Sequence, residues 1–87
     1  MKKVTLYTKN YCPYCSKAKA LLKRKGVVDI NEIDITYDEM AQQELLAKSG
    51  GRKTVPQIFI GEFHVGGCDD LYALESAKRL DELLAEN

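Results

Sequence analysis

The sequence predicts an α/β fold with a four-stranded mixed sheet flanked by helices, in the order β-α-β-α-β-β-α. Two short β-rich runs separated by a helical stripe predict a parallel pair of strands with a right-handed crossover. Two later β-rich runs lie on either side of Gly61-Glu62, a Gly-X pair that predicts a hairpin. The 87 residues contain no repeat and no linker, so we expect one domain over residues 1–87.

The first half of the chain is expected to form a strand, a helix and a second strand. Residues 4–8 are rich in β-formers and are predicted to be the first strand. The helix is predicted to begin at Pro13, where proline fits the first turn, and to end at Gly26. Its apolar stripe is formed by Tyr14, Ala18, Leu21 and Leu22. Residues 27–35 are again β-rich, but their alternation slips phase, which leaves the start of this strand open.

A second helix is predicted between the second and third strands. Thr36 and Glu39 have the spacing of a capping box, and Asp38 is an alternative cap by itself. Leu45 lies on one face of this helix, and Gly50-Gly51 ends it.

The third and fourth strands and a final helix complete the prediction. Pro56 precedes a run of β-formers at residues 57–60, and a proline that cannot donate to the ladder fits the start of a strand. Residues 63–65 return antiparallel after the hairpin turn. Asp69 or Asp70 is expected to cap the last helix, whose apolar pattern resumes through residues 80–84.

Charge and composition argue against several classes of function. Thirteen Lys and Arg match thirteen Asp and Glu, so the chain lacks the basic surface that nucleic acids and anionic membranes require. The apolar runs are too short for a membrane span, and the one near the start is interrupted too early for a signal peptide. We therefore expect a cytoplasmic protein that binds neither nucleic acid nor membrane. Three cysteines are too few for a secreted disulfide scaffold, which suggests that they serve chemistry.

The most informative motif is Cys12-Pro13-Tyr14-Cys15, at the handover from the first strand to the first helix. Unpaired N–H groups at a helix N-terminus carry about half a positive charge and favour a thiolate at Cys12. In such settings the pKa of a cysteine falls from about 8.5 toward about 3.5–7.5. Cys15 lies one turn further and is expected to be more buried, within reach of Cys12. The pair is thus predicted to form a reversible disulfide between an attacking and a resolving thiol.

Two other interpretations of the cysteines stay open on the residues alone. Cys12, Cys15, His64 and Cys68 form a conceivable zinc set, although the spacing is loose for a structural site. The pair could also be two buried core cysteines. Cys68 has no partner at short spacing and is expected to be a small buried residue, and His64 an exposed strand residue.

Two further segments suggest a ligand groove. If the Val55-Pro56 bond is cis, the Val55 N–H and C=O face outward, where an extended peptide-like ligand can pair with them. The turn Gly66-Gly67-Cys68-Asp69-Asp70 offers free N–H groups to a carboxylate and aspartates to an ammonium group, although the turn considered by itself favours plain helix capping. Lys48, Arg52 and Lys53 form a basic cluster that either is solvated or attracts a ligand carboxylate.

Taken together, these segments resemble a known family. Tyr7-Thr8-Lys9, Cys12-Pro13-Tyr14-Cys15, Thr54-Val55-Pro56-Gln57-Ile58-Phe59-Ile60 and Gly66-Gly67-Cys68-Asp69-Asp70, in this order and spacing, resemble the dithiol glutaredoxins, and most of all the bacterial glutaredoxin 3 type. The resemblance covers essentially the whole chain. The chain has no tryptophan before Cys12 and carries Pro-Tyr between the cysteines, which sets it apart from thioredoxin itself.

The resemblance implies a thioredoxin-like fold and a role for each matching residue. Cys12 would be the catalytic nucleophile and Cys15 the resolving cysteine of a redox-active disulfide. Glutathione would act as co-substrate in a groove formed by Lys9, Tyr14, Thr54, Val55, a cis Pro56, Cys68 and Asp69. In that groove Lys9 would face the glycine carboxylate, and Cys68 and Asp69 would hold the γ-glutamyl end. Arg52 and Lys53 remain doubtful contacts.

The activity implied is glutathione-dependent thiol–disulfide exchange by a monomeric enzyme, with no metal expected. Its partners would be glutathione and proteins that carry disulfides or glutathionyl groups, ribonucleotide reductase being one candidate. Two alternatives stay open. One is a redoxin that depends on thioredoxin reductase, and the other is an iron–sulfur module held by Cys12 and glutathione between two subunits.

Overall fold

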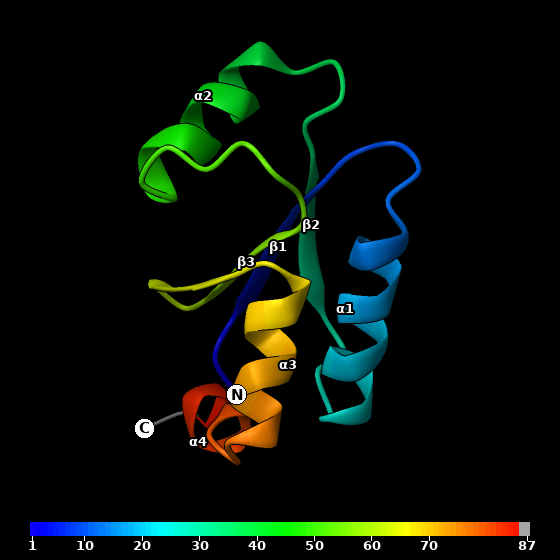
Figure 1. Cartoon of the computed structure of the whole chain (residues 1–87), viewed down its shortest axis with the longest axis vertical. Helices are drawn as coiled ribbons and strands as arrows, with labels where there is room; N and C mark the ends of the chain where they lie inside the picture. Colours follow the sequence, from blue (N-terminus) through cyan, green and yellow to red (C-terminus); the bar gives the residue numbers. More distant parts are fainter. Residues whose placement is uncertain (86–87) are drawn as a thin grey trace.

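A single mixed sheet forms the centre of the computed structural model, which describes residues 1–85 (Figure 1). Its strands are β1 (Val4–Thr8), β2 (Ile30–Asp34), β3 (Gln57–Ile60) and β4 (Phe63–Gly66), in the spatial order β2-β1-β3-β4. β1 is parallel to β2 and antiparallel to β3, which pairs antiparallel with β4. The predicted order and the mixed sheet are confirmed, and β2 begins at Ile30.

Four helices of the described residues, 1–85, cover the two faces of this sheet. The helices α1 (Pro13–Arg24), α3 (Cys68–Ser76) and α4 (Leu80–Leu84) share one face, and α2 (Glu39–Lys48) covers the other. Figure 1 shows α2 standing apart from the other three helices. Because successive side chains of a strand point to opposite faces, Leu6 packs in the core beneath α1 and α3, whereas Tyr7 packs beneath α2.

The buried stripe of α1 differs from the predicted one at its first position. Tyr14 is 60% exposed, while Cys15 is only 2% exposed and continues the buried stripe through Ala18 and Leu22. Residues 15, 18 and 22 lie at i, i+3 and i+7, a spacing as compatible with one helical face as the predicted one. The packing of α1 on the sheet therefore buries the second cysteine and leaves the tyrosine exposed.

The starts of α2 and α3 decide between the predicted caps. Asp38 caps α2, because its Oδ1 accepts the N–H of Ala41 at 3.0 Å. For α3 the prediction was wrong: the cap position is Gly67, and neither Asp69 nor Asp70 occupies it. Asp70 is the third residue of the helix and reaches back, so that its Oδ2 accepts the Gly67 N–H at 2.8 Å. A glycine cap has no side-chain acceptor, and a carboxylate one turn later satisfies the free donor instead.

Within residues 1–85, no helix is both long and apolar enough to cross a membrane.

Candidate active site

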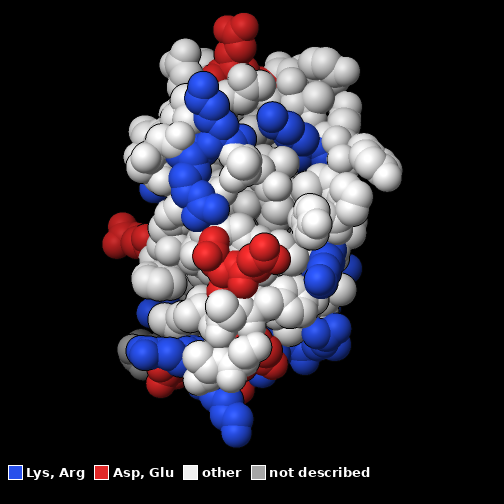
Figure 2. All heavy atoms as spheres, in the orientation of Figure 1, with Lys and Arg blue, Asp and Glu red and all other residues white. Residues whose placement is uncertain are grey.

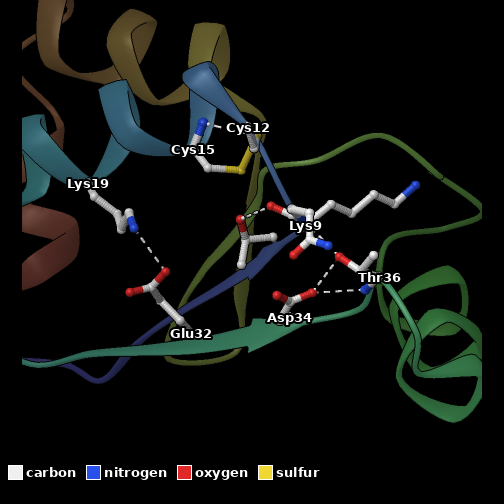
Figure 3. Close-up of a disulfide and its surroundings, with 9 residues drawn as sticks. Lys9, Cys12, Cys15, Lys19, Glu32, Asp34 and Thr36 are labelled. Atoms are coloured by element: carbon white, nitrogen blue, oxygen red, sulfur yellow. Dashed lines mark hydrogen bonds and ion pairs between the residues drawn. A yellow bond between two sulfur atoms is a disulfide. The ribbon is translucent and has the colours of Figure 1, made fainter.

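The Cys12–Cys15 pair lies where β1 passes into α1. Cys12 is the cap residue of α1 with extended backbone (φ −128°, ψ 93°), and Pro13 opens the first turn. The two cysteines form a disulfide with their Cα atoms 5.2 Å apart. The N–H of Cys15 also donates to Cys12 Sγ at 3.2 Å, the dashed contact in Figure 3. Cys12 is half-buried and Cys15 is buried, so the expected difference in exposure is confirmed.

A cleft of about 330 Å³ brings the two other sequence segments together. It is lined by Tyr14, Arg52, Thr54, Val55, Pro56, Gly67, Cys68, Asp69 and Asp70. The turn before β3 and the turn before α3 thus face each other beside the start of α1, although they are separate in the sequence. The Val55–Pro56 peptide bond is cis, and among residues 1–85 no hydrogen bond engages the N–H or the C=O of Val55.

Lys9 is the predicted groove residue that the structure places elsewhere. It lines a second hollow, together with Cys12, Cys15, Lys19 and Glu32, and is exposed. Figure 3 shows its side chain extending away from the disulfide, beyond the Asp34–Thr36 hydrogen bonds. The other predicted groove residues share the cleft described above.

Arg52 and Asp70 both line the cleft and form an ion pair there. Arg52 Nη1 lies 3.4 Å from Asp70 Oδ2, so the residue that remained doubtful from sequence faces an aspartate that was expected only to cap. Figure 2 shows acidic side chains gathered where α3 begins, with basic side chains beside them. The sequence signal that Asp70 offered was its position three residues after Gly67.

Cys68 lies in the wall of the cleft as a buried thiol, 5% exposed and without a disulfide. Burial raises the pKa of its thiol above the ordinary value, and Asp69 adds to the rise while Lys17 opposes it. The thiol is therefore held in its neutral, weakly nucleophilic form. Its backbone N–H, at the first turn of α3, is the part of the residue that a ligand can use.

His64 is not the exposed strand residue that was expected. It is half-buried on β4, its ring stacks on Phe59 with centroids 4.8 Å apart, and its Nε2 lies 2.7 Å from Gln57 Oε1. His64 pairs with Phe59 in the β3–β4 ladder, and Phe59 packs in the cluster beneath α2, so the histidine ring lies on that face. Within the described part of the chain, no three His, Cys, Asp or Glu side chains are placed to hold a metal ion.

Comparisons with known proteins agree with this arrangement. The profile of the glutaredoxin family matches residues 4–65. Glutaredoxin 3 of Escherichia coli K12 is 52% identical over 84 residues, covering 97% of this chain and 99% of that protein.

Solved structures extend the likeness to three dimensions. The solution structure of a Brucella melitensis glutaredoxin is 56% identical, with a TM-score of 0.81 over 97% of this chain and 89% of that one. A buckwheat glutaredoxin–glutathione complex is 31% identical, with a TM-score of 0.83 over 95% and 76% of the two chains.

Proposed function

The chain belongs to the glutaredoxin family, and on this premise we propose that it reduces protein disulfides and protein–glutathione mixed disulfides at the expense of glutathione. The observation that carries the proposal is the Cys12–Cys15 disulfide at the start of α1, beside a cleft lined by the residues expected to bind glutathione. The thioredoxin-like fold, shared with the solved structures, supports it.

Cys12 is the attacking sulfur in this proposal, since it is the more exposed member of the pair and caps the helix. The Cys15 N–H directed at Cys12 Sγ stabilises negative charge there, as does the positive end of the α1 dipole. A sulfur anion so stabilised is both a nucleophile at neutral pH and a good leaving group. These two properties are what repeated thiol–disulfide exchange requires.

Reduction of a mixed disulfide then proceeds in two exchanges. The Cys12 thiolate attacks the glutathione sulfur, the protein–glutathione bond breaks, and the protein leaves as a thiolate that takes a proton from water. A glutathione thiolate next attacks the glutathione sulfur bound to Cys12, which releases oxidised glutathione and regenerates the Cys12 thiolate. A protein disulfide is instead opened by Cys12 and resolved by Cys15, which leaves the Cys12–Cys15 disulfide for glutathione to reduce.

The cleft supplies the orientation of the glutathionyl group. The free N–H and C=O of Val55 would pair with the cysteinyl backbone as one added rung of strand. Thr54 flanks this contact, and Tyr14 covers it from α1. The γ-glutamyl carboxylate would meet the N–H groups at the start of α3, and its ammonium the Asp69 side chain. Lys9, on the other side of Cys12, would attract the glycine carboxylate over a longer distance.

The experiment that tests the proposal is a coupled turnover assay with a glutathionylated peptide. Glutathione, glutathione reductase and NADPH form one arm, and thioredoxin reductase with NADPH forms the other. We expect turnover only in the first arm. Turnover only in the second arm would identify a redoxin of the other type, and a visible absorption band after anaerobic purification would favour the iron–sulfur alternative.

A further inference from the structure

A chain of two hydrogen bonds connects the cleft to the opposite face of the sheet through Gln57. Gln57 is fully buried at the start of β3. Its Nε2 donates to Thr54 Oγ1 at 3.1 Å, and its Oε1 lies 2.7 Å from His64 Nε2. Thr54 lines the cleft, whereas His64 lies on β4, so a side chain inside the protein contacts both.

The direction of these hydrogen bonds is determined by the chemistry of the amide. The oxygen of Gln57 only accepts, so His64 must donate from an Nε2–H, which makes that the tautomer of the neutral ring. The nitrogen of Gln57 only donates, so Thr54 Oγ1 is an acceptor in this contact. The hydroxyl hydrogen of Thr54 therefore points elsewhere, and within residues 1–85 it has no acceptor.

His64 is held firmly enough to fix the orientation of the amide. Its ring stacks on Phe59 at an interplanar angle of 24°, and the same two residues are partners in the β3–β4 ladder. A buried amide that lost either partner would bear an unsatisfied polar group, which opposes rotation of the Gln57 side chain. Neither Gln57 nor His64 lines the cleft, so neither touches a ligand there, and Thr54 is the cleft residue to which Gln57 is hydrogen-bonded.

We propose that Gln57, fixed by His64, is a positioning residue that presents the Thr54 hydroxyl as a hydrogen-bond donor to the backbone of the ligand in the cleft. The inference rests on the proposed function, because the ligand is the glutathionyl group of the mixed disulfide. The inference assigns roles to Gln57 and His64, which do not belong to the groove that the family resemblance implied.

The test compares steady-state constants for a glutathionylated peptide in four variants. Thr54→Val removes the hydroxyl and keeps the shape, and Gln57→Glu keeps the shape of the amide but offers Thr54 only an acceptor, which turns its hydroxyl inward. Each should raise KM about two- to tenfold, the range of one neutral hydrogen bond, and leave kcat unchanged. The double variant should raise KM no further than the larger single effect.

Tyr7→Phe is the matched control. Tyr7 is fully buried next to Gln57 in the β1–β3 register, and its hydroxyl donates to Glu44 Oε1 at 2.8 Å, away from the cleft. Its KM should equal that of the original protein. An equal rise of KM in Tyr7→Phe and Gln57→Glu, or additive effects of Thr54→Val and Gln57→Glu, would overturn the inference and leave the proposed function standing.

A second measurement does not depend on the variants or on turnover. Nitrogen-15 NMR of the unaltered protein at pH 8 should show His64 with its proton on Nε2. An Nδ1–H tautomer would reverse the direction of the chain and overturn the inference. If the unaltered protein shows no glutathione-dependent turnover at all, the proposed function fails first, and the role of Thr54 toward a glutathionyl ligand fails with it.

Discussion

The backbone N–H of Cys15 points at the sulfur of Cys12, with 3.2 Å between the nitrogen and Sγ. The contact exists because Cys12 occupies the cap of α1 and Cys15 follows in the third helical position. A neutral thiol gains little from it, whereas a thiolate gains a charge-assisted hydrogen bond. The same geometry buries Cys15 and leaves Cys12 accessible, so the two sulfurs differ in what they can do.

The two cysteines should therefore respond differently to substitution by serine. Cys12→Ser should abolish turnover of both protein disulfides and mixed disulfides, because no attacking sulfur remains. Cys15→Ser should retain reduction of mixed disulfides, since glutathione resolves the Cys12 adduct, and should lose reduction of protein disulfides. Both substrates are measured with glutathione and glutathione reductase, and equal loss in the two variants would contradict this division of roles.

Cys68 should be the least reactive thiol of the reduced protein. It is buried, and burial raises the pKa of its thiol, so the thiolate fraction at pH 7 is small. Iodoacetamide at pH 7 should alkylate Cys12 first, as read by peptide mass spectrometry, with Cys68 modified only after unfolding in guanidinium. Modification of Cys68 at a rate close to that of Cys12 in the folded protein would contradict its burial.

Asp69→Asn should weaken binding of the glutathionyl group, because an amide at the start of α3 can no longer attract an ammonium by charge. We expect KM for a glutathionylated peptide to rise about tenfold, the scale of one charge-assisted hydrogen bond. Asp81→Asn is the control, since Asp81 pairs with Lys25 at 2.9 Å and lines no part of the cleft. Equal effects of the two substitutions would indicate that only overall charge matters.

Gly66→Ala should destabilise the fold far more than Gly67→Ala. Gly66 has φ +112°, and a Cβ there would collide with the carboxylate of Asp70 and lie 2.9 Å from Arg52 Nη1. An alanine at this φ strains the backbone, and its Cβ displaces Asp70, which leaves the Gly67 N–H without its acceptor. Together these effects should lower the free energy of unfolding by about 1–3 kcal/mol. A Cβ on Gly67 would meet the carbonyl oxygen of Pro56 at an ordinary 3.5 Å. Urea unfolding of both variants under reducing conditions measures the difference, and equal loss would contradict the role of Asp70.

His64 should make stability depend on pH between about pH 7 and pH 5. Burial, and then repulsion from Arg52, lowers the pKa of His64, while Asp70 opposes this. As pH falls, the unfolded chain takes up the histidine proton before the folded chain does, so the unfolded state gains stability. The free energy of unfolding should thus fall from pH 7 toward pH 5 more steeply than in His64→Gln. Parallel pH profiles in urea unfolding would show that His64 does not titrate differently in the two states.

The elements of the fold were predictable because their signals are local. Residues 4–8 became β1 with the expected bounds, and the Gly61-Glu62 turn became the hairpin between β3 and β4. The errors came where two adjacent residues fit the same helical pattern equally well, so that the sequence does not show which of them is buried. Tyr14 and Cys15 are adjacent, and only the packing of α1 against the sheet decides which of them faces inward.

For the cleft, too, the residues that lie in short motifs were predictable, whereas the contacts that form only on folding were not. Tyr14, Thr54 and Asp69 each lie in a recognisable motif, and the family resemblance implied that the motifs share a groove. The arrangement around His64 carries no such signal, because its ring contacts Gln57 and Phe59 only after β3 and β4 have paired. Arg52 likewise meets Asp70 only when the segment before β3 folds against the start of α3.

By itself, then, the sequence determined the helices and strands, the family and the pair of sulfurs, since spacing and turn chemistry act over a few residues. The tertiary structure alone decided which aspartate satisfies Gly67, which residue of the first turn is buried, and how Gln57 connects Thr54 to His64. The hydrogen-bonded residues are only three to seven positions apart in the sequence, so the backbone of the turns and of the β3–β4 hairpin decides whether they meet. The burial of Cys15 in place of Tyr14 is decided by the packing of α1 on the sheet, and no periodicity along the chain encodes either outcome.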